Sequence, residues 1–212
     1  MDERKFGQNQ KDEAANKMSI VHIVGKGSTA RYLKHDDYPD DIFVAVNHAA
    51  IFMDKIDYLF ANDVEGLEGI PDEIFSRVNT FVIPLHPHLD GLPKEDVTNE
   101  YVIKKYDLDR FNPNYIIYNL HTWKNPNPDL VTPEGASSTS GMAIGYFLKY
   151  KNIKHFETYG IGNKEGYNPE VYRYISKENY KFEKNWKRKR IENLRHSIFK
   201  IVKKYNATIN FN

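Results

Sequence analysis

The chain of 212 residues contains no cysteine. This absence excludes disulfide bonds, thiolate metal sites and cysteine nucleophiles, and it fits a reducing compartment. No stretch approaches the roughly 18 consecutive apolar residues of a membrane-spanning helix, so no span is predicted. A charge excess is also lacking, because 30 Lys and Arg against 29 Asp and Glu residues give a net charge of +1. The overall charge therefore indicates neither a nucleic acid nor a membrane surface as partner.

The N-terminal residues lack the apolar segment of a secretory signal. Residues 1–17 are charged and rich in amide side chains, a composition that predicts a disordered tail. Residues 18–212 have a length typical of one α/β domain. We therefore expect a single folded domain after the tail, and a cytoplasmic location.

The most informative stretch is residues 20–29, IVHIVGKGST, which opens with a β-branched apolar run typical of a buried parallel strand. Gly25 and Gly27 then allow a sharp turn and a close approach of the backbone. Ser28 and Thr29 are expected to cap the start of a helix. A strand, a glycine turn and a helix start together favour a phosphate-bearing ligand, such as a nucleotide. A plain strand-to-helix turn fits the same pattern.

Short apolar runs and helical segments alternate along the first 120 residues. This alternation predicts βαβ units and a Rossmann-like α/β domain with a mostly parallel, twisted sheet flanked by helices. Residues 84–114 contain mixed charges and no periodicity, and we expect them to be irregular. The strands are expected at 42–46, 57–60, 80–83 and 115–118, with helices at 30–34 and 49–53.

Three polar residues follow the second and third predicted strands. Asn47 ends the second strand, and Asn62 and Asp63 follow the third. The carboxyl ends of parallel strands meet at one edge of a sheet, where ligands bind near a switch in strand order. We therefore expect these side chains to lie at the ligand site.

A second stretch, residues 137–148 (SSTSGMAIGYFL), combines capping hydroxyls with apolar and small residues. It predicts a buried helix, and Gly141 and Gly145 would let that helix lie close to the sheet or to a ligand. A strand over 154–159 follows and ends at Gly160. A well-capped core helix without a ligand is the alternative.

The C-terminal region is the one segment with a charge bias. Residues 181–204 contain ten Lys and Arg residues against two Glu residues, and their apolar residues recur at helical spacing. We expect a long amphipathic helix whose basic cluster, residues 186–190, binds a phosphate or an anionic acceptor; a solvated basic face is the alternative. Residues 208–211 are expected to add a final strand.

In this order, the landmarks resemble the bacterial sialyltransferases of glycosyltransferase family 42 and their uncharacterised relatives. The resemblance covers roughly residues 20–162. It is carried by the glycine turn, by the asparagines after two strands, by a Thr-Ser-Gly that opens a buried helix, and by a glycine-isoleucine pair. The matching residues are Gly25-Lys26-Gly27-Ser28, Asn47, Asn62, Thr139-Ser140-Gly141 and Gly160-Ile161.

The resemblance implies a Rossmann-like fold that holds a cytidine nucleotide-sugar without a metal. Two positions depart from the family pattern. Gly162 stands where the aspartate after the glycine-isoleucine pair is usual, and the family's catalytic histidine falls close to Lys189. Tyr167 and Tyr172 are near the positions of the tyrosines that steady the donor phosphate. The resemblance therefore implies nucleotide binding by this chain more directly than it implies sialyl transfer.

Sugar transfer from a nucleotide requires a stabilised leaving phosphate and a base for the acceptor hydroxyl. We rank His48 first as the base because it follows the second strand, with His121 and His196 as alternatives. Amides and cations can stabilise the phosphate. The candidates are the N–H groups of Gly27 and Ser28, Ser140, and the basic cluster that includes Arg188 and Lys189.

No metal site or cofactor is predicted, because His86, His88 and Asp90 read as loop residues. Two other classes stay open: a pyrophosphokinase or nucleotidyl-transfer enzyme, with Mg²⁺ held by carboxylates such as Asp63, and a non-catalytic nucleotide- or nucleic-acid-binding protein. The expected partner is a CMP- or UDP-linked sugar donor. The acceptor stays open between a glycan and a modified nucleic acid, and a homo-oligomer is compatible with the sequence.

Overall fold

The computed structural model describes residues 19–89, 91–93, 96–119, 129–134, 138–162, 167–174 and 184–212, with residues 184–190 described for their backbone. The predicted tail, residues 1–17, lies outside this part of the chain. None of the helices within the described ranges is long and apolar enough to cross a membrane.

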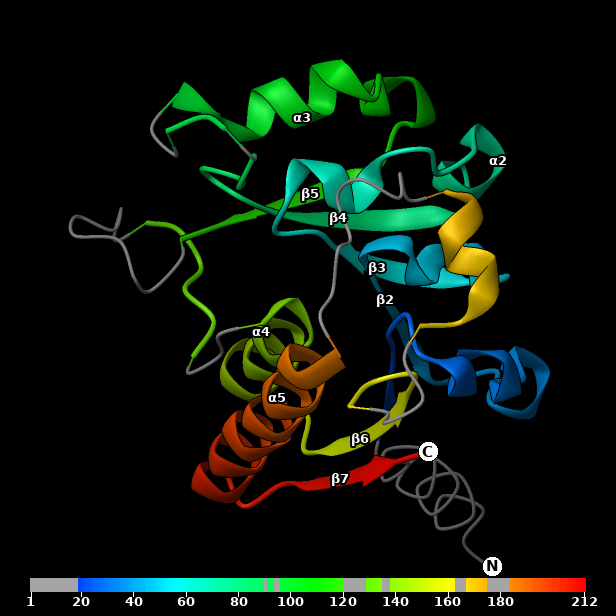
Figure 1. The fold of residues 1–212 in the computed structure, drawn as a ribbon, viewed down its shortest axis with the longest axis vertical. Helices are drawn as coiled ribbons and strands as arrows, with labels where there is room; N and C mark the ends of the chain where they lie inside the picture. Colours follow the sequence, from blue (N-terminus) through cyan, green and yellow to red (C-terminus); the bar gives the residue numbers. More distant parts are fainter. Residues whose placement is uncertain are drawn as a thin grey trace, which may run out of the picture.

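The described residues form a seven-stranded sheet in which every strand runs parallel to its neighbours (Figure 1). The order across the sheet is β5-β4-β3-β2-β1-β6-β7. This confirms the predicted α/β class, and the sheet is wholly parallel. The strands are β1 (Val21–Val24), β2 (Ile42–Val46), β3 (Ile56–Phe60), β4 (Val78–Pro84), β5 (Asn114–Tyr118), β6 (His155–Tyr159) and β7 (Thr208–Phe211).

Successive residues of the strands alternate between two apolar cores, one on each face of the sheet. On β2, Phe43 and Ala45 belong to one core, whereas Val44 and Val46 belong to the other. Burial on both faces explains why the strands read as continuous apolar runs. Helices α4 (Thr139–Tyr146) and α5 (Lys184–Lys204) lie side by side on one face (Figure 1), and α2 (Asp72–Phe75) and α3 (Asn99–Lys105) cover the other.

Helix α4 confirms the predicted buried, capped helix. The Ser138 hydroxyl accepts a hydrogen bond from the Gly141 N–H group at 3.1 Å, and every residue from Thr139 to Tyr146 is buried. A Cβ atom on Gly145 would lie 2.5 Å from the Glu134 carbonyl oxygen. Gly145 therefore allows the backbone around Glu134 to approach the helix, whereas we had expected the sheet or a ligand there.

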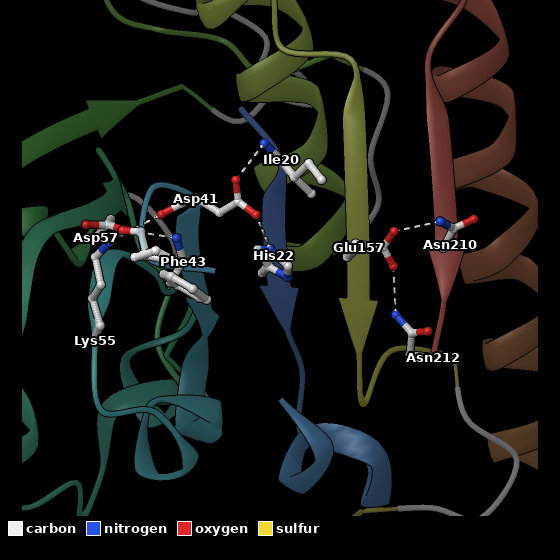
Figure 2. A network of polar contacts seen from close by, with 10 residues as sticks. Ile20, His22, Asp41, Phe43, Lys55, Asp57, Glu157, Asn210 and Asn212 are labelled. Carbon is white, nitrogen blue, oxygen red and sulfur yellow. Dashed lines mark hydrogen bonds and ion pairs between the residues drawn. The ribbon is translucent and has the colours of Figure 1, made fainter. Parts of the chain in front are cut away.

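The predicted C-terminal helix and strand are also confirmed. Ile198, Ile201 and Val202 of α5 are buried in the same core as α4. After this helix, β7 pairs with β6. The Glu157 carboxylate of β6 accepts hydrogen bonds from the side-chain amides of Asn210 at 2.6 Å and Asn212 at 2.8 Å, as Figure 2 shows.

The two short helices expected after β1 and β2 are present with bounds shifted by one or two residues, whereas the expectation for residues 84–114 was wrong. The segments expected as helices at 30–34 and 49–53 are the short 3-10 helices Ser28–Tyr32 and Asn47–Phe52. The segment 84–114, expected to be irregular, contains α3 and the 3-10 helix Leu108–Phe111. Within α3 only Asn99 and Val102 are buried. One buried apolar residue in α3, with Ile103 partly buried beside it, leaves too little periodicity for a prediction.

Carboxylates at the amino edge of the sheet tie neighbouring strands together (Figure 2). Asp41, just before β2, accepts from the Ile20 N–H group at 3.3 Å and lies 2.9 Å from Nε2 of the fully buried His22. On β3, Asp57 accepts from the Phe43 N–H group at 2.9 Å. These contacts pair the entry of each strand with its neighbour and so help to set the register.

Candidate functional site

The strand order places a topological switch point between β1 and β6. From β1 the chain adds β2 to β5 on one side, and it then returns to add β6 and β7 on the other side. In open parallel sheets, ligands bind beyond the carboxyl ends of the strands at such a point. Here the 25–28 turn follows β1, and the glycines at 160 and 162 follow β6.

The two glycine turns pack against each other. The Gly25 N–H group donates to the Tyr159 carbonyl oxygen at 2.7 Å, and the Gly27 N–H group donates to Gly160 at 2.9 Å. A Cβ atom on Gly27 would lie 2.8 Å from the Gly160 Cα atom. The glycines are therefore required for contact between the turns. The expectation that the Gly27 amide faces a phosphate was wrong, because this N–H group donates to the Gly160 carbonyl oxygen just after β6.

Ser28 and Thr29 do not cap a helix, contrary to expectation. Gly27 is the N-cap of the five-residue 3-10 helix, and no side-chain hydrogen bond caps it. The Thr29 hydroxyl instead accepts from the Gly160 N–H group at 2.7 Å and donates to the Asn212 carbonyl oxygen at 2.8 Å. The hydroxyl thus bridges the ends of three strands, which a local sequence pattern does not reveal.

Lys26 and Tyr167 lie together at this turn, although 141 positions separate them in the sequence. The Lys26 Nζ atom is 4.7 Å from the centre of the Tyr167 ring, and the Asn168 N–H group donates to the Lys26 carbonyl oxygen at 2.8 Å. The Tyr167 and Tyr172 ring centres are 6.3 Å apart. A cation and a phenol are thereby held beside the switch point, where they suit an anionic ligand.

Asn47 lies directly after β2, as predicted, in the left-handed region with φ 53°. Its side chain is buried against Gly66, on which a Cβ atom would lie 2.7 Å from Asn47 Oδ1. Within the described residues this Oδ1 atom has no hydrogen-bond partner. An acceptor is therefore buried, unpaired, at the carboxyl edge.

His48, our first candidate for the base, is 1 % exposed. Its Nε2 atom lies 2.7 Å from the Glu68 carbonyl oxygen, which only accepts, so Nε2 carries the proton and Nδ1 carries a lone pair. Nδ1 has no partner among the described residues. Burial, with a smaller contribution from the Lys26 charge, lowers the pKa of His48 to about 4. This ring accepts a hydrogen bond at neutral pH but is a weak base.

Asn62 connects the end of β3 to β5 and α4. Its Oδ1 atom accepts from the Tyr118 hydroxyl, and its Nδ2 group contacts the Met142 sulfur at 3.2 Å. This contact places the first turn of α4 at the carboxyl edge of the sheet. The predicted site residues of that turn, all buried, are Thr139, Ser140 and Gly141.

Asp63 lies beside His88, a residue that the sequence had suggested was an ordinary loop histidine. The His88 Nδ1 atom lies 3.8 Å from Asp63 Oδ1, and both side chains are nearly half exposed. Backbone bonds fix the pair, since the Val64 N–H group donates to His88 at 2.8 Å and the His88 N–H group donates to Asn62 at 3.0 Å. The structure thus places an accessible imidazole beside a carboxylate at the candidate site.

For the other predicted site residues, the structure shows either no polar contact with a described residue or no described side chain. His196 is exposed on α5, without a hydrogen bond or ion pair to any described residue. Arg188 and Lys189 belong to α5, but their side chains lie outside the described part of the chain, as do His121 and Asp90. No group of three or more His, Asp or Glu side chains suited to a metal occurs among the described residues.

An open hollow of about 400 Å³ lies beside α3. Three of its lining residues carry carboxylates, which repel phosphate and argue against a nucleotide there. The lining residues are Glu100, Ile103, Lys104, Asp107 and Asp109.

Comparison of the chain with protein-family models, with curated proteins and with solved structures finds no match. The resemblance to the family 42 sialyltransferases therefore stays a prediction, and the site has to be interpreted from its own geometry.

Proposed function

We propose that this protein is a glycosyltransferase that binds a CMP- or UDP-linked sugar at the carboxyl edge of its sheet and transfers the sugar without a metal ion. The observation that carries the proposal is the pair of buried acceptors, Asn47 Oδ1 and His48 Nδ1, without partners among the described residues. An unpaired buried polar atom costs about 1–3 kcal/mol. Both atoms are closed off from solvent in this structure, so a ligand donates hydrogen bonds to them only when neighbouring groups move aside, and those bonds would then remove this cost.

The chemistry around these acceptors favours a nucleotide. Asn47 Oδ1 and His48 Nδ1 require donors, such as ribose hydroxyl or base amino groups. Lys26 and Tyr167 beside the neighbouring turn supply a charge and a hydroxyl, which suit phosphate oxygens. The Lys26 charge contributes to the lowered pKa of His48. A ligand with hydroxyl groups at one end and phosphate at the other matches this arrangement.

In the proposed reaction, an acceptor oxygen forms a bond to the anomeric carbon of the sugar. The bond from that carbon to the phosphate oxygen breaks, and the nucleotide leaves with the electron pair. Lys26 and Tyr167 stabilise the negative charge that develops on the leaving phosphate. A fixed cation and a phenol thus do the work that a divalent metal does in other transferases.

The proton of the acceptor hydroxyl must go to a base. His88 suits this role better than His48, because its ring is accessible and Asp63 can stabilise the imidazolium that forms. His48 instead orients the donor through its Nδ1 lone pair. This assignment predicts that His88→Asn lowers the turnover rate while leaving donor affinity nearly unchanged.

Calorimetric titration with CMP, UMP and their sugar conjugates tests the proposal. Asn47→Gly keeps the left-handed backbone and removes the amide, so it should weaken nucleotide binding about tenfold. Asn152→Gly is the matched control, since Asn152 has the same φ of 53° and is exposed after α4. Its affinity should equal that of the wild type.

Other outcomes are informative. A wild-type chain that binds no nucleotide contradicts the proposal. Binding that a chelator abolishes supports the nucleotidyl-transfer alternative instead, and binding without turnover of any nucleotide-sugar supports a non-catalytic binder.

A further inference from the structure

Arg195 of α5 is a cation with an incomplete set of contacts. Its Nε atom is inaccessible to solvent and has no hydrogen-bond partner among the described residues. The guanidinium carbon lies 5.0 Å from the centre of the Phe211 ring on β7, which holds the side chain by a cation–π contact. No carboxylate of the described residues pairs with it. The side chain as a whole is partly exposed, so its terminal N–H groups can meet an anion, and the buried Nε–H group without an acceptor is unfavourable until one is supplied.

Gly162 makes room for this arginine. Its φ of +70° favours glycine, and a Cβ atom there would lie 2.7 Å from Arg195 Nε and 3.0 Å from Arg195 Cγ. Any larger side chain at this position would displace the arginine. Gly160, two residues earlier, packs on the 25–28 turn. Arg195 therefore reaches the end of β6 at the switch point.

We propose that Arg195 binds the phosphate oxygens of the nucleotide. Gly162 permits this because it has no side chain in the space that Arg195 occupies. The inference rests on the proposed function and adds a residue to its binding site. A guanidinium group only donates hydrogen bonds, and its planar fork matches the paired oxygens of a phosphate. It therefore complements the acceptors Asn47 and His48, which suit the nucleoside end of the same ligand.

Titration with CMP and with cytidine, which lacks the phosphate, isolates the role of Arg195. Arg195→Gln should weaken CMP binding about ten- to a hundredfold and leave cytidine binding unchanged. Arg195→Lys should recover part of the loss, since it restores the charge without the fork. Lys200→Gln, which removes an exposed charge from the same helix, is the control and should bind CMP like the wild type.

A second variant displaces the arginine without removing it. Gly162→Ala should lower CMP affinity and spare cytidine affinity. The control is Gly91→Ala, because Gly91 also has a positive φ (+82°) but no atom within 4 Å of the added Cβ. Both alanines strain the backbone, so a difference between them reports the contact with Arg195.

The outcomes separate this inference from the proposed function. Equal CMP affinity in Arg195→Gln and Lys200→Gln overturns the inference alone, as does an equal loss for CMP and cytidine, which would indicate a structural role. A wild type that binds neither compound overturns both proposals.

Discussion

The two edges of the sheet are built differently. At the amino edge, Asp41 accepts from the amide just before β1, Asp57 accepts from the second amide of β2, and Asp41 also contacts His22. At the carboxyl edge, the described residues leave Asn47 Oδ1, His48 Nδ1, Asn99 Oδ1 and Arg195 Nε buried without a partner. The carboxylates of the amino edge thus hold strands together, whereas the carboxyl edge leaves several of its polar atoms unpaired, although Thr29 and Asn62 connect strand ends there too.

Two histidine rings that pack on Phe43 are exceptions to this difference between the edges. His22 Nδ1 and His35 Nε2 also lack partners among the described residues. Both of these rings pack on Phe43, with ring centres 5.1 Å and 4.6 Å away, so aromatic contacts surround them. The carboxyl edge instead combines acceptors, donors and a cation within a few strand ends. Such a mixture of groups is typical of a binding site.

The largest effect on stability should come from the amino edge. Asp41→Ala removes the acceptor of the Ile20 amide and the partner of buried His22, so the free energy of unfolding should fall by about 3 kcal/mol. Nucleotide affinity should stay within about twofold of the wild type. Denaturant unfolding and calorimetry measure the two quantities. The control is Asp54→Ala, which breaks an exposed ion pair with Arg77 and should cost less than about 0.5 kcal/mol. A large loss of nucleotide affinity in Asp41→Ala would contradict the separate roles assigned to the two edges.

The pH dependence of stability should report the buried His48. Burial lowers its pKa in the folded state to about 4, from an ordinary value of 6.5. The unfolded chain therefore binds the proton more readily between these values, so stability is full above pH 6.5 and falls as the pH drops towards 4. At pH 4.5 the loss from this ring should reach about 2–3 kcal/mol. In His48→Gln, urea unfolding at pH 7 and 4.5 should show a decrease smaller by that amount. Parallel pH profiles in the two proteins would contradict the burial argument.

A smaller effect, on binding alone, should come from Lys26. Lys26→Gln removes the charge beside Tyr167 and should weaken CMP binding about five- to tenfold, with little change in melting temperature. Lys149 provides the matched control, because its ammonium group also lies over a tyrosine ring, that of Tyr150 at 5.1 Å, on the segment that follows α4. If Lys149→Gln weakens binding equally, the effect arises from net charge and the contrast between the edges loses support.

Local patterns predicted most of the fold. The apolar runs of β1, β2 and β6 and the capped start of α4 were recognised because each is encoded within ten residues. Helix α3 was missed because a single buried apolar residue, Val102, anchors it. The short helices after β1 and β2 were predicted without a helix type, and both are 3-10 helices.

The site was predicted less completely, and the reason is sequence separation. Asn47 and Asn62 could be placed at strand ends from local patterns alone. The pairing of Gly27 with Gly160, and of Lys26 with Tyr167, depends on which strands are neighbours, and no local pattern encodes the strand order. His88 and Arg195 were missed for the same reason. The one sequence signal related to Arg195 was Gly162, which stands where the family that the chain resembles usually has an aspartate.

The position of β1 has a consequence for the order in which the molecule forms. On one side β1 pairs with β2, the next strand in the sequence, and on the other with β6, where Val21 lies opposite Phe156. At a synthesis rate of roughly 5–20 residues per second, this second neighbour emerges about 7–27 s after β1. During that interval one side of β1 exposes unpaired backbone groups, which can pair with other chains. The switch point, with its glycine turns, can therefore close only late in synthesis, and the candidate binding edge is completed after most of the sheet that supports it.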